Sequence, residues 1–204
     1  MWALVESGNV TKIYNNPKQI TVGDIQYPSN IFMLWTSSEL EAIGIYEVVI
    51  DNTNYKDPKY YINTNQSFAF GSGKVTATYG TATARAIADT LYTAQDETDG
   101  FGTEGEVKSK GLKTLHKEVI NSQAAGNLSP TDWMVVRAAE GGTAVPSSIT
   151  TQRAAVRTKA NAMCTQIDNA ANVDALATLY AYVNTGTEDS PVYERPLGEL
   201  PTVG

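Results

Sequence analysis

The sequence predicts an α+β protein: a small antiparallel β-rich domain, then a helical domain built as a helix hairpin or bundle, then an extended C-terminal arm. Before position 80, short runs of β-branched and aromatic residues alternate with turn-forming residues. From Thr81 onward, apolar residues recur at spacings of three and four, which is the period of a helix. After Gly186 this periodicity ends in a segment with three prolines. We therefore expect domains at 1–80 and 81–184 and an arm at 185–204.

The first domain is expected to consist mainly of hairpins. Residues 2–5 and 10–14 flank one turn, and residues 20–22 and 25–27 flank the tight turn Gly23-Asp24. A short helix follows, with Ser38 and Glu41 in capping-box spacing and Gly44 as its stop. Residues 45–51 form a strand, and residues 60–63 and 66–70 are expected to pair with residues 74–79.

Helices are expected through most of the second domain. Three apolar faces are predicted to point inward: Ala84, Ile87, Ala88, Leu91 and Tyr92; then Val107, Leu112, Leu115 and Val119; and finally Val173, Leu176, Tyr180 and Val183 after the cap Asn172. The glycine-rich acidic loop at 99–105 lacks the ligand pattern of an EF-hand and is expected to be a hinge.

The most informative stretch spans residues 127–157. Ser129 and Asp132 can cap a helix on which Trp133, Val136 and Arg137 share a face, and Gly141-Gly142 ends it. A second helix begins near Ser147 or Ser148, and its apolar stripe is Val156, Ala160, Met163 and Ile167. Arg153 and Arg157 lie four residues apart beside that stripe, with Glu140 as the nearest expected anionic partner. Two interpretations remain open, an Arg–Glu seam between the helices and a basic binding surface.

This stretch resembles a module of bacteriophage tail-fibre assembly and related tail-region proteins. The likeness covers residues 127–182 and rests on Thr131, Asp132, Trp133, Arg137, Glu140, Pro146, Arg153 and Arg157. The first 51 residues are also similar to the opening of marine phage tail proteins. The resemblance implies a structural tail component in the baseplate, fibre-attachment or tail-tip region, or alternatively an assembly chaperone that binds fibre protein and then leaves.

Composition argues against several other classes of function. One cysteine, Cys164, and one histidine, His116, are too few for a His/Cys zinc site, and His116 lies in an ordinary amphipathic segment unsuited to a catalytic triad. No cofactor, metal or catalytic residue is expected. A hydrolase would need paired carboxylates at a set separation, and the acidic residues at 96–106 are expected to lie in a loop where no sequence signal fixes that separation. The net charge of −7 argues against nucleic acid as the ligand.

The expected partners are copies of this chain, in a trimer or higher ring, and neighbouring tail or fibre proteins. The arm contains the large apolar side chains Tyr193, Leu197 and Leu200, and we expect it to lie across a neighbouring subunit. The other possibility is that the arm is a disordered tail. Seven tyrosines before position 80 either cover the β-core or form a surface for subunits or host glycans. No secretory leader or membrane-spanning run is present, so we expect synthesis in the bacterial cytoplasm and a final location in the virion tail.

Overall fold

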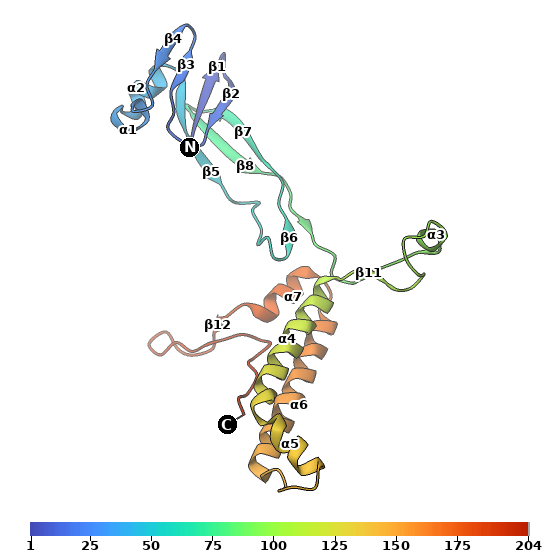
Figure 1. Ribbon diagram of the computed structural model, residues 1–204. Helices are drawn as coiled ribbons and strands as arrows, with labels where there is room; N and C mark the ends of the chain where they lie inside the picture. The colour runs from blue at the N-terminus through green and yellow to red at the C-terminus, as the bar shows by residue number, and fades with distance from the viewer. Residues whose placement is uncertain (204) are drawn as a thin grey trace. The chain divides into compact units, whose positions relative to one another are not determined.

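The computed structural model describes residues 1–203 and confirms the α+β fold class, with strands before helices (Figure 1). The chain forms two compact units, the first from Met1 to Thr83 and the second from Ala84 onward. Each unit buries its own set of apolar side chains.

A curled five-stranded sheet is the centre of the first unit. Its order is β2-β1-β5-β8-β7, formed by β1 (Trp2–Glu6), β2 (Asn9–Tyr14), β5 (Ile45–Asp51), β7 (Gln66–Gly71) and β8 (Lys74–Tyr79). The two outer strands β2 and β7 approach each other, which curls the sheet. The predicted hairpins β1–β2 and β7–β8 are confirmed.

One strand pair departs from the expected antiparallel arrangement. Residues 45–47 of β5 pair antiparallel with β1, whereas residues 48–51 pair parallel with β8. The chain crosses over between β5 and β8 and makes the β7–β8 hairpin on its way back, so that β8 runs in the direction of β5. Apolar residues can alternate in the same way in parallel and antiparallel strands, so the sequence pattern could not show that β5 and β8 run parallel.

Alternation along the strands gives this unit two apolar clusters. Ala3 and Leu4 are adjacent in β1 and therefore point to opposite faces of the sheet. Ala3 packs with Val48, Val75 and Ala77 in one cluster. Leu4 belongs to the other cluster, with Tyr14, Ile20, Ile31, Phe32, Leu40 and Ile45.

Smaller elements cover the second cluster. They are the predicted hairpin β3 (Ile20–Val22) and β4 (Ile25–Tyr27), then α1 (Ile31–Leu34) and α2 (Ser37–Ala42). The capping box of α2 is formed by Thr36 and Glu39 rather than Ser38 and Glu41, because the helix begins earlier than predicted. Gly44 ends the helical segment as expected, at a φ of 81°, and a Cβ there would lie 2.9 Å from the Val5 carbonyl oxygen.

Two further predictions near residues 60–96 are wrong. The strand β6 (Tyr61–Ile62) pairs with β9 (Thr83–Ala84) and not with β8. The apolar face expected on a helix from Ala84 to Tyr92 does not form, because residues 81–96 contain β9, β10 (Thr90–Leu91) and the start of α3 (Ala94–Thr98), and β10 pairs with β11 (Val107–Ser109).

Residues 86–89, which include a bend at 87–88, cap the next helix, α4 (Leu112–Leu128). The carbonyls of Ala86 and Ile87 accept from the amides of Leu112 and Lys113 at 2.9 and 3.0 Å. The Asp89 carboxylate accepts from the Gly111 amide at 2.7 Å and from the Thr114 hydroxyl at 2.9 Å. These bonds satisfy the first amides of α4, which no residue within the helix can satisfy.

The remaining helices are η1 (Ser129–Thr131), α5 (Asp132–Ala139), α6 (Ser147–Asn169) and α7 (Val173–Tyr180). α6 runs back along α4, and its predicted stripe Val156, Ala160, Met163 and Ile167 is fully confirmed as buried (Figure 1). The Asn172 cap is also confirmed, since its side-chain oxygen accepts from the Ala175 amide at 2.8 Å.

The predicted inward face of α4 is partly wrong. Leu115 and Val119 are 44% and 52% exposed, and the buried residues are Leu112, His116, Ile120 and Ala124. His116 packs on the Tyr180 ring, with centroids 4.6 Å apart. The short strands β12 (Val183–Asn184) and β13 (Tyr193–Glu194) follow, with Val183 exposed rather than inward. Within residues 1–203, no helix combines the length and the hydropathy needed to span a membrane.

Candidate interaction site

Arg153 connects α6 to the junction between α4 and α5. Its Nη1 donates to the Leu128 carbonyl oxygen at 2.7 Å and to the Thr131 hydroxyl at 2.6 Å. Its Nη2 forms an ion pair with Asp132 Oδ1 at 2.7 Å, and the side chain is only 12% exposed. One planar guanidinium therefore contacts the end of α4, the turn η1 and the start of α5.

The predicted seam exists, but its carboxylate is Asp132 and not Glu140. Leu128 and Thr131 lie where α4 gives way to the 3-10 turn η1, at the end of α4 where carbonyls lack amide partners within the helix. The Leu128 carbonyl accepts from the Thr131 hydroxyl at 3.0 Å and from the Arg153 guanidinium. Glu140 instead ends α5, where its amide donates to the Val136 carbonyl at 3.0 Å. Within residues 1–203 its carboxylate forms no ion pair.

Trp133 and Arg137 are brought together on the outer side of α5. The Arg137 guanidinium lies 4.8 Å from the centre of the Trp133 ring, although Trp133 is 54% exposed. Gly142 packs against the Arg137 side chain, and its amide donates to the Arg137 carbonyl at 2.9 Å. Trp133 thus has a cation against its ring while about half of its surface remains exposed.

Arg157 lies one turn beyond Arg153 on α6, and its side chain is exposed. Within residues 1–203 it forms no ion pair. It borders a depression of about 280 Å³ between α5 and α6, together with Val135, Val145, Thr150 and Arg153. We call the set Trp133, Val135, Val136, Arg137 and Arg157 the α5–α6 surface.

The C-terminal arm folds back on its own chain. Leu197 is 0% exposed and its amide donates to the Leu179 carbonyl at 3.0 Å. Asn127 on α4 donates to the Pro201 carbonyl oxygen at 3.0 Å, and Leu200 is half-buried. The expectation that Leu197 lies across a neighbouring subunit is therefore wrong, because this leucine completes the core of its own helical unit. Tyr193 remains available at 64% exposure.

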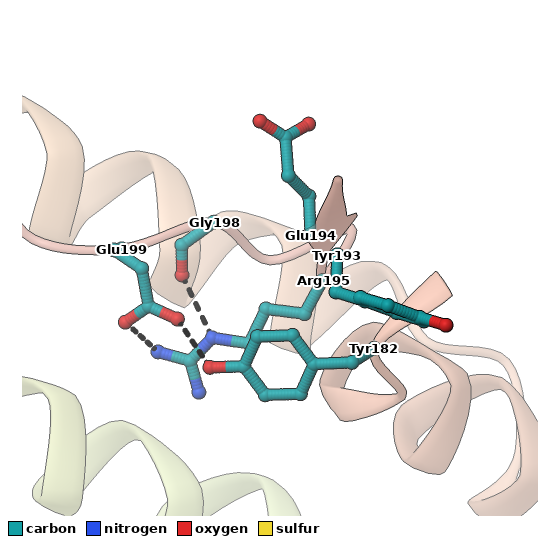
Figure 2. A pocket seen from close by; sticks show the side chains of 6 residues that line it. All are labelled: Tyr182, Tyr193, Glu194, Arg195, Gly198 and Glu199. Atoms are coloured by element: carbon teal, nitrogen blue, oxygen red, sulfur yellow. Dashed lines mark hydrogen bonds and ion pairs between the residues drawn. The ribbon is translucent and has the colours of Figure 1, made fainter. Parts of the chain in front are cut away.

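A pocket of about 310 Å³ opens on the arm beside Tyr193 (Figure 2). We call it the tyrosine pocket; it is lined by Tyr182, Tyr193, Glu194, Arg195, Gly198 and Glu199. Its polar groups are fixed by mutual contacts, which Figure 2 shows as dashed lines. Arg195 pairs with Glu199 Oε2 at 2.6 Å and donates from Nε to the Gly198 carbonyl at 2.9 Å.

The Tyr182 hydroxyl donates to Glu199 Oε1 at 2.8 Å. This hydrogen bond, followed by partial desolvation and the charge of Glu199, raises the pKa of Tyr182. Glu199 is thus engaged through both oxygens, whereas Glu194 forms no ion pair within residues 1–203. The Glu194 carboxylate accepts a hydrogen bond from the Thr185 hydroxyl at 3.4 Å.

Sequence reasoning found Tyr193 but missed the rest of the pocket. A usable signal is the strand pairing of Asn184 with Tyr193, because alternation then places Tyr182, Tyr193 and Arg195 on one face of the β12–β13 ribbon. Gly198, at a φ of 72°, lets the chain turn so that Glu199 meets Arg195. That contact depends on the turn and could not be read from spacing.

A metal site in the described part of the chain would require several His, Cys, Asp or Glu side chains close together. No three His, Cys, Asp or Glu side chains within residues 1–203 are arranged to hold a metal ion. Burial raises the pKa of the Cys164 thiol, and the only histidine is packed in the core. The acidic stretch 96–106 includes an ion pair between Asp96 and Lys108 at 2.6 Å.

The sequence matches no family model, and neither the curated proteins nor the solved structures compared with it include a match. The resemblance to phage tail proteins accordingly stays a prediction, which rests on the residue pattern from Thr131 to Arg157 and on the first 51 residues.

Proposed function

We propose that this protein is a structural component of a bacteriophage tail, in the baseplate, fibre-attachment or tail-tip region, and that it acts through contacts between subunits. The observation that carries the proposal is the α5–α6 surface, where Trp133 is exposed yet held against Arg137. Tryptophan and arginine are the residues that most often dominate the energy of protein interfaces.

The support beneath this surface suits an assembly role. Arg153 fixes the α4–α5 junction through three short polar contacts, so the surface is ordered before any partner arrives. A preordered surface loses little conformational entropy on binding, which favours a lasting contact over a transient one. This is the feature that leads us to prefer a resident tail subunit over the alternative, an assembly chaperone.

The first unit offers a separate surface for a different tail or fibre protein. Ile25, Met33 and Leu34 are apolar and exposed on β4 and α1. Met33 and Leu34 are adjacent on α1, and exposed apolar side chains that lie together mark interaction sites more often than single ones do. In the proposed role this end of the chain docks on a neighbouring protein of the tail.

Quantitative mass spectrometry of purified infectious particles tests the proposal. A resident tail subunit is expected at a fixed copy number, a multiple of three or six. Absence from particles, together with recovery of the chain from lysates bound to fibre protein, would contradict the structural role and favour the chaperone. A phage carrying Trp133→Ala should incorporate less of the protein, whereas Thr158→Ala, a change at an exposed α6 position outside the surface, should not.

A further inference from the structure

We propose that the depression between α5 and α6 binds a glutamate side chain of a partner protein, and that the Arg157 guanidinium holds its carboxylate. The inference rests on the proposed function and deepens it, because it names the chemistry that a partner must offer to the α5–α6 surface. It follows from the size of the depression, the charges that line it and the hydrogen-bond donors that remain unused there.

The depression has the size of a side chain and not of a free metabolite. Its volume is about 280 Å³, which is below the roughly 300–1,000 Å³ of sites that enclose small molecules. Val135 and Val145 form apolar walls, and Val135 is 42% exposed. Methylene groups gain free energy by packing against such walls. The depression therefore suits a ligand with a short apolar stem and a polar end.

The charges at the depression leave one cation without a counter-ion. Its lining includes Arg153 and Arg157 but no acidic residue. Asp132 balances Arg153, with which it pairs at 2.7 Å. Asp168, the only acidic residue of α6, pairs with Lys117 at 2.7 Å. Within residues 1–203 no carboxylate lies at ion-pair distance from Arg157, so this guanidinium can attract an anion from outside.

The hydrogen-bond donors left for a ligand are also those of Arg157. The terminal nitrogens of Arg153 are already used at the α4–α5 junction. The Thr150 hydroxyl donates to the Pro146 carbonyl at 3.3 Å. Arg157 is exposed, and no group within residues 1–203 accepts a hydrogen bond from it. A guanidinium presents parallel N–H groups that match the two oxygens of a carboxylate.

A glutamate side chain meets these requirements together. Its carboxylate can pair with Arg157 while its two methylene groups lie against Val135 and Val145. A phosphate group of a nucleic acid fits less well, because it has no apolar stem and because the net charge of −7 opposes binding of a polyanion.

Nuclear magnetic resonance of the full chain, titrated with N-acetyl-glutamate amide, tests the proposal. We expect saturable shifts of the Val145 and Thr150 amides and of the Arg157 Nε signal, with a dissociation constant on the order of 1 mM for a ligand of this size. Arg157→Ala should weaken binding by about 10-fold or more. Arg157→Lys should weaken it less, because an ammonium group keeps the charge but loses the parallel donors.

Matched controls separate charge from shape. N-acetyl-glutamine amide has nearly the same shape without the charge and should bind about 10-fold more weakly or worse. Val135→Ser removes an exposed apolar wall and should weaken binding of the glutamate probe several-fold. Thr158→Ala, at an exposed α6 position outside the depression, should leave the dissociation constant unchanged. Circular dichroism should confirm that each variant remains folded.

Three outcomes would overturn the proposal: no saturable shifts at Val145, Thr150 and Arg157, equal binding of the glutamine analogue, or tighter binding of inorganic phosphate than of the glutamate probe. These outcomes are distinct from failure of the proposed function. A chain that is present in particles but does not bind the probe refutes the glutamate site alone. A chain that binds the probe through Arg157 but is absent from particles refutes the tail role alone.

Discussion

Arg153 supplies hydrogen-bond donors to the α4–α5 junction from a different helix. Its guanidinium donates to the Leu128 carbonyl, one of the last four carbonyls of α4, and to the Thr131 hydroxyl. These two groups also bond to each other at 3.0 Å, and Asp132 gains a counter-ion from Arg153. The order of this junction depends on a residue more than 20 positions away.

Replacing Arg153 by alanine is expected to lower the free energy of unfolding by about 1–3 kcal/mol, because it removes hydrogen bonds made by a charged donor that is only 12% exposed. Urea unfolding followed by the helical circular dichroism signal measures this. Arg157→Ala, at an exposed position on the same helix, should stay within about 0.5 kcal/mol of the wild type. An Arg153→Ala protein as stable as Arg157→Ala would refute the seam.

Asp96 is the residue whose ionisation is most clearly coupled to local structure. The hydrogen bond from Lys108, then those from Thr93, lower the pKa of Asp96 to about 2. A folded pKa below the unfolded value means that the carboxylate stabilises this segment above pH ~4 and that the benefit is lost as the pH falls toward 2.

We therefore expect the turn at Thr93 and its contact with Lys108 to loosen between pH ~4 and 2. The amide chemical shifts of Thr93 and Asp96 across that pH range report the change. In Asp96→Asn the transition should be missing, since nothing is left to titrate at that position. A wild-type transition centred near the ordinary aspartate pKa would contradict the coupling.

At the scale of single elements, the helical period predicted α6 well and α4 less well. In α6 the stripe Val156 to Ile167 is the only apolar stripe available. α4 offers two, and the sequence favoured Leu115 and Val119 because His116 looks polar. Packing on Tyr180 makes His116 a core residue, so the choice was decided by a contact from α7 that the sequence of α4 does not contain.

Residues 81–96 show the same limit more strongly. Their spacing fits a helix, yet the carbonyls of Ala86 and Ile87 and the carboxylate of Asp89 are used to cap α4. The hydrogen bonds that cap the first turn of α4 outweighed the weak preference of residues 81–96 for a helix. The spacing of apolar residues does not show which segment will be used to cap another helix.

Leu197 anchors the arm, and its replacement tests how far the tyrosine pocket depends on the core. Leu197→Ala is expected to cost about 2–5 kcal/mol, because it empties a fully buried site. Urea unfolding measures the loss, and hydrogen exchange at Arg195 and Gly198 should accelerate as the turn is freed. Val192→Ala, at an exposed position on the arm, is the control and should change neither quantity by much.

At the scale of the whole molecule, the sequence predicted a β-rich part before a helical part, and the structure has that order. It did not predict that β5 and β8 run parallel or that the arm closes the helical core. Both features join segments that are distant in sequence. Short-range patterns describe which face of an element is apolar, but not which other element will cover it.

The residues that cap α4 lie more than 20 positions before the helix begins to use them. A fragment that starts at Gly111 would contain the whole helix but none of the groups that accept hydrogen bonds from its first amides. Such a helix would fray at its N-terminus, because the first turn of an isolated helix is costly to form. A fragment meant to hold the helical unit intact should therefore begin before Ala86.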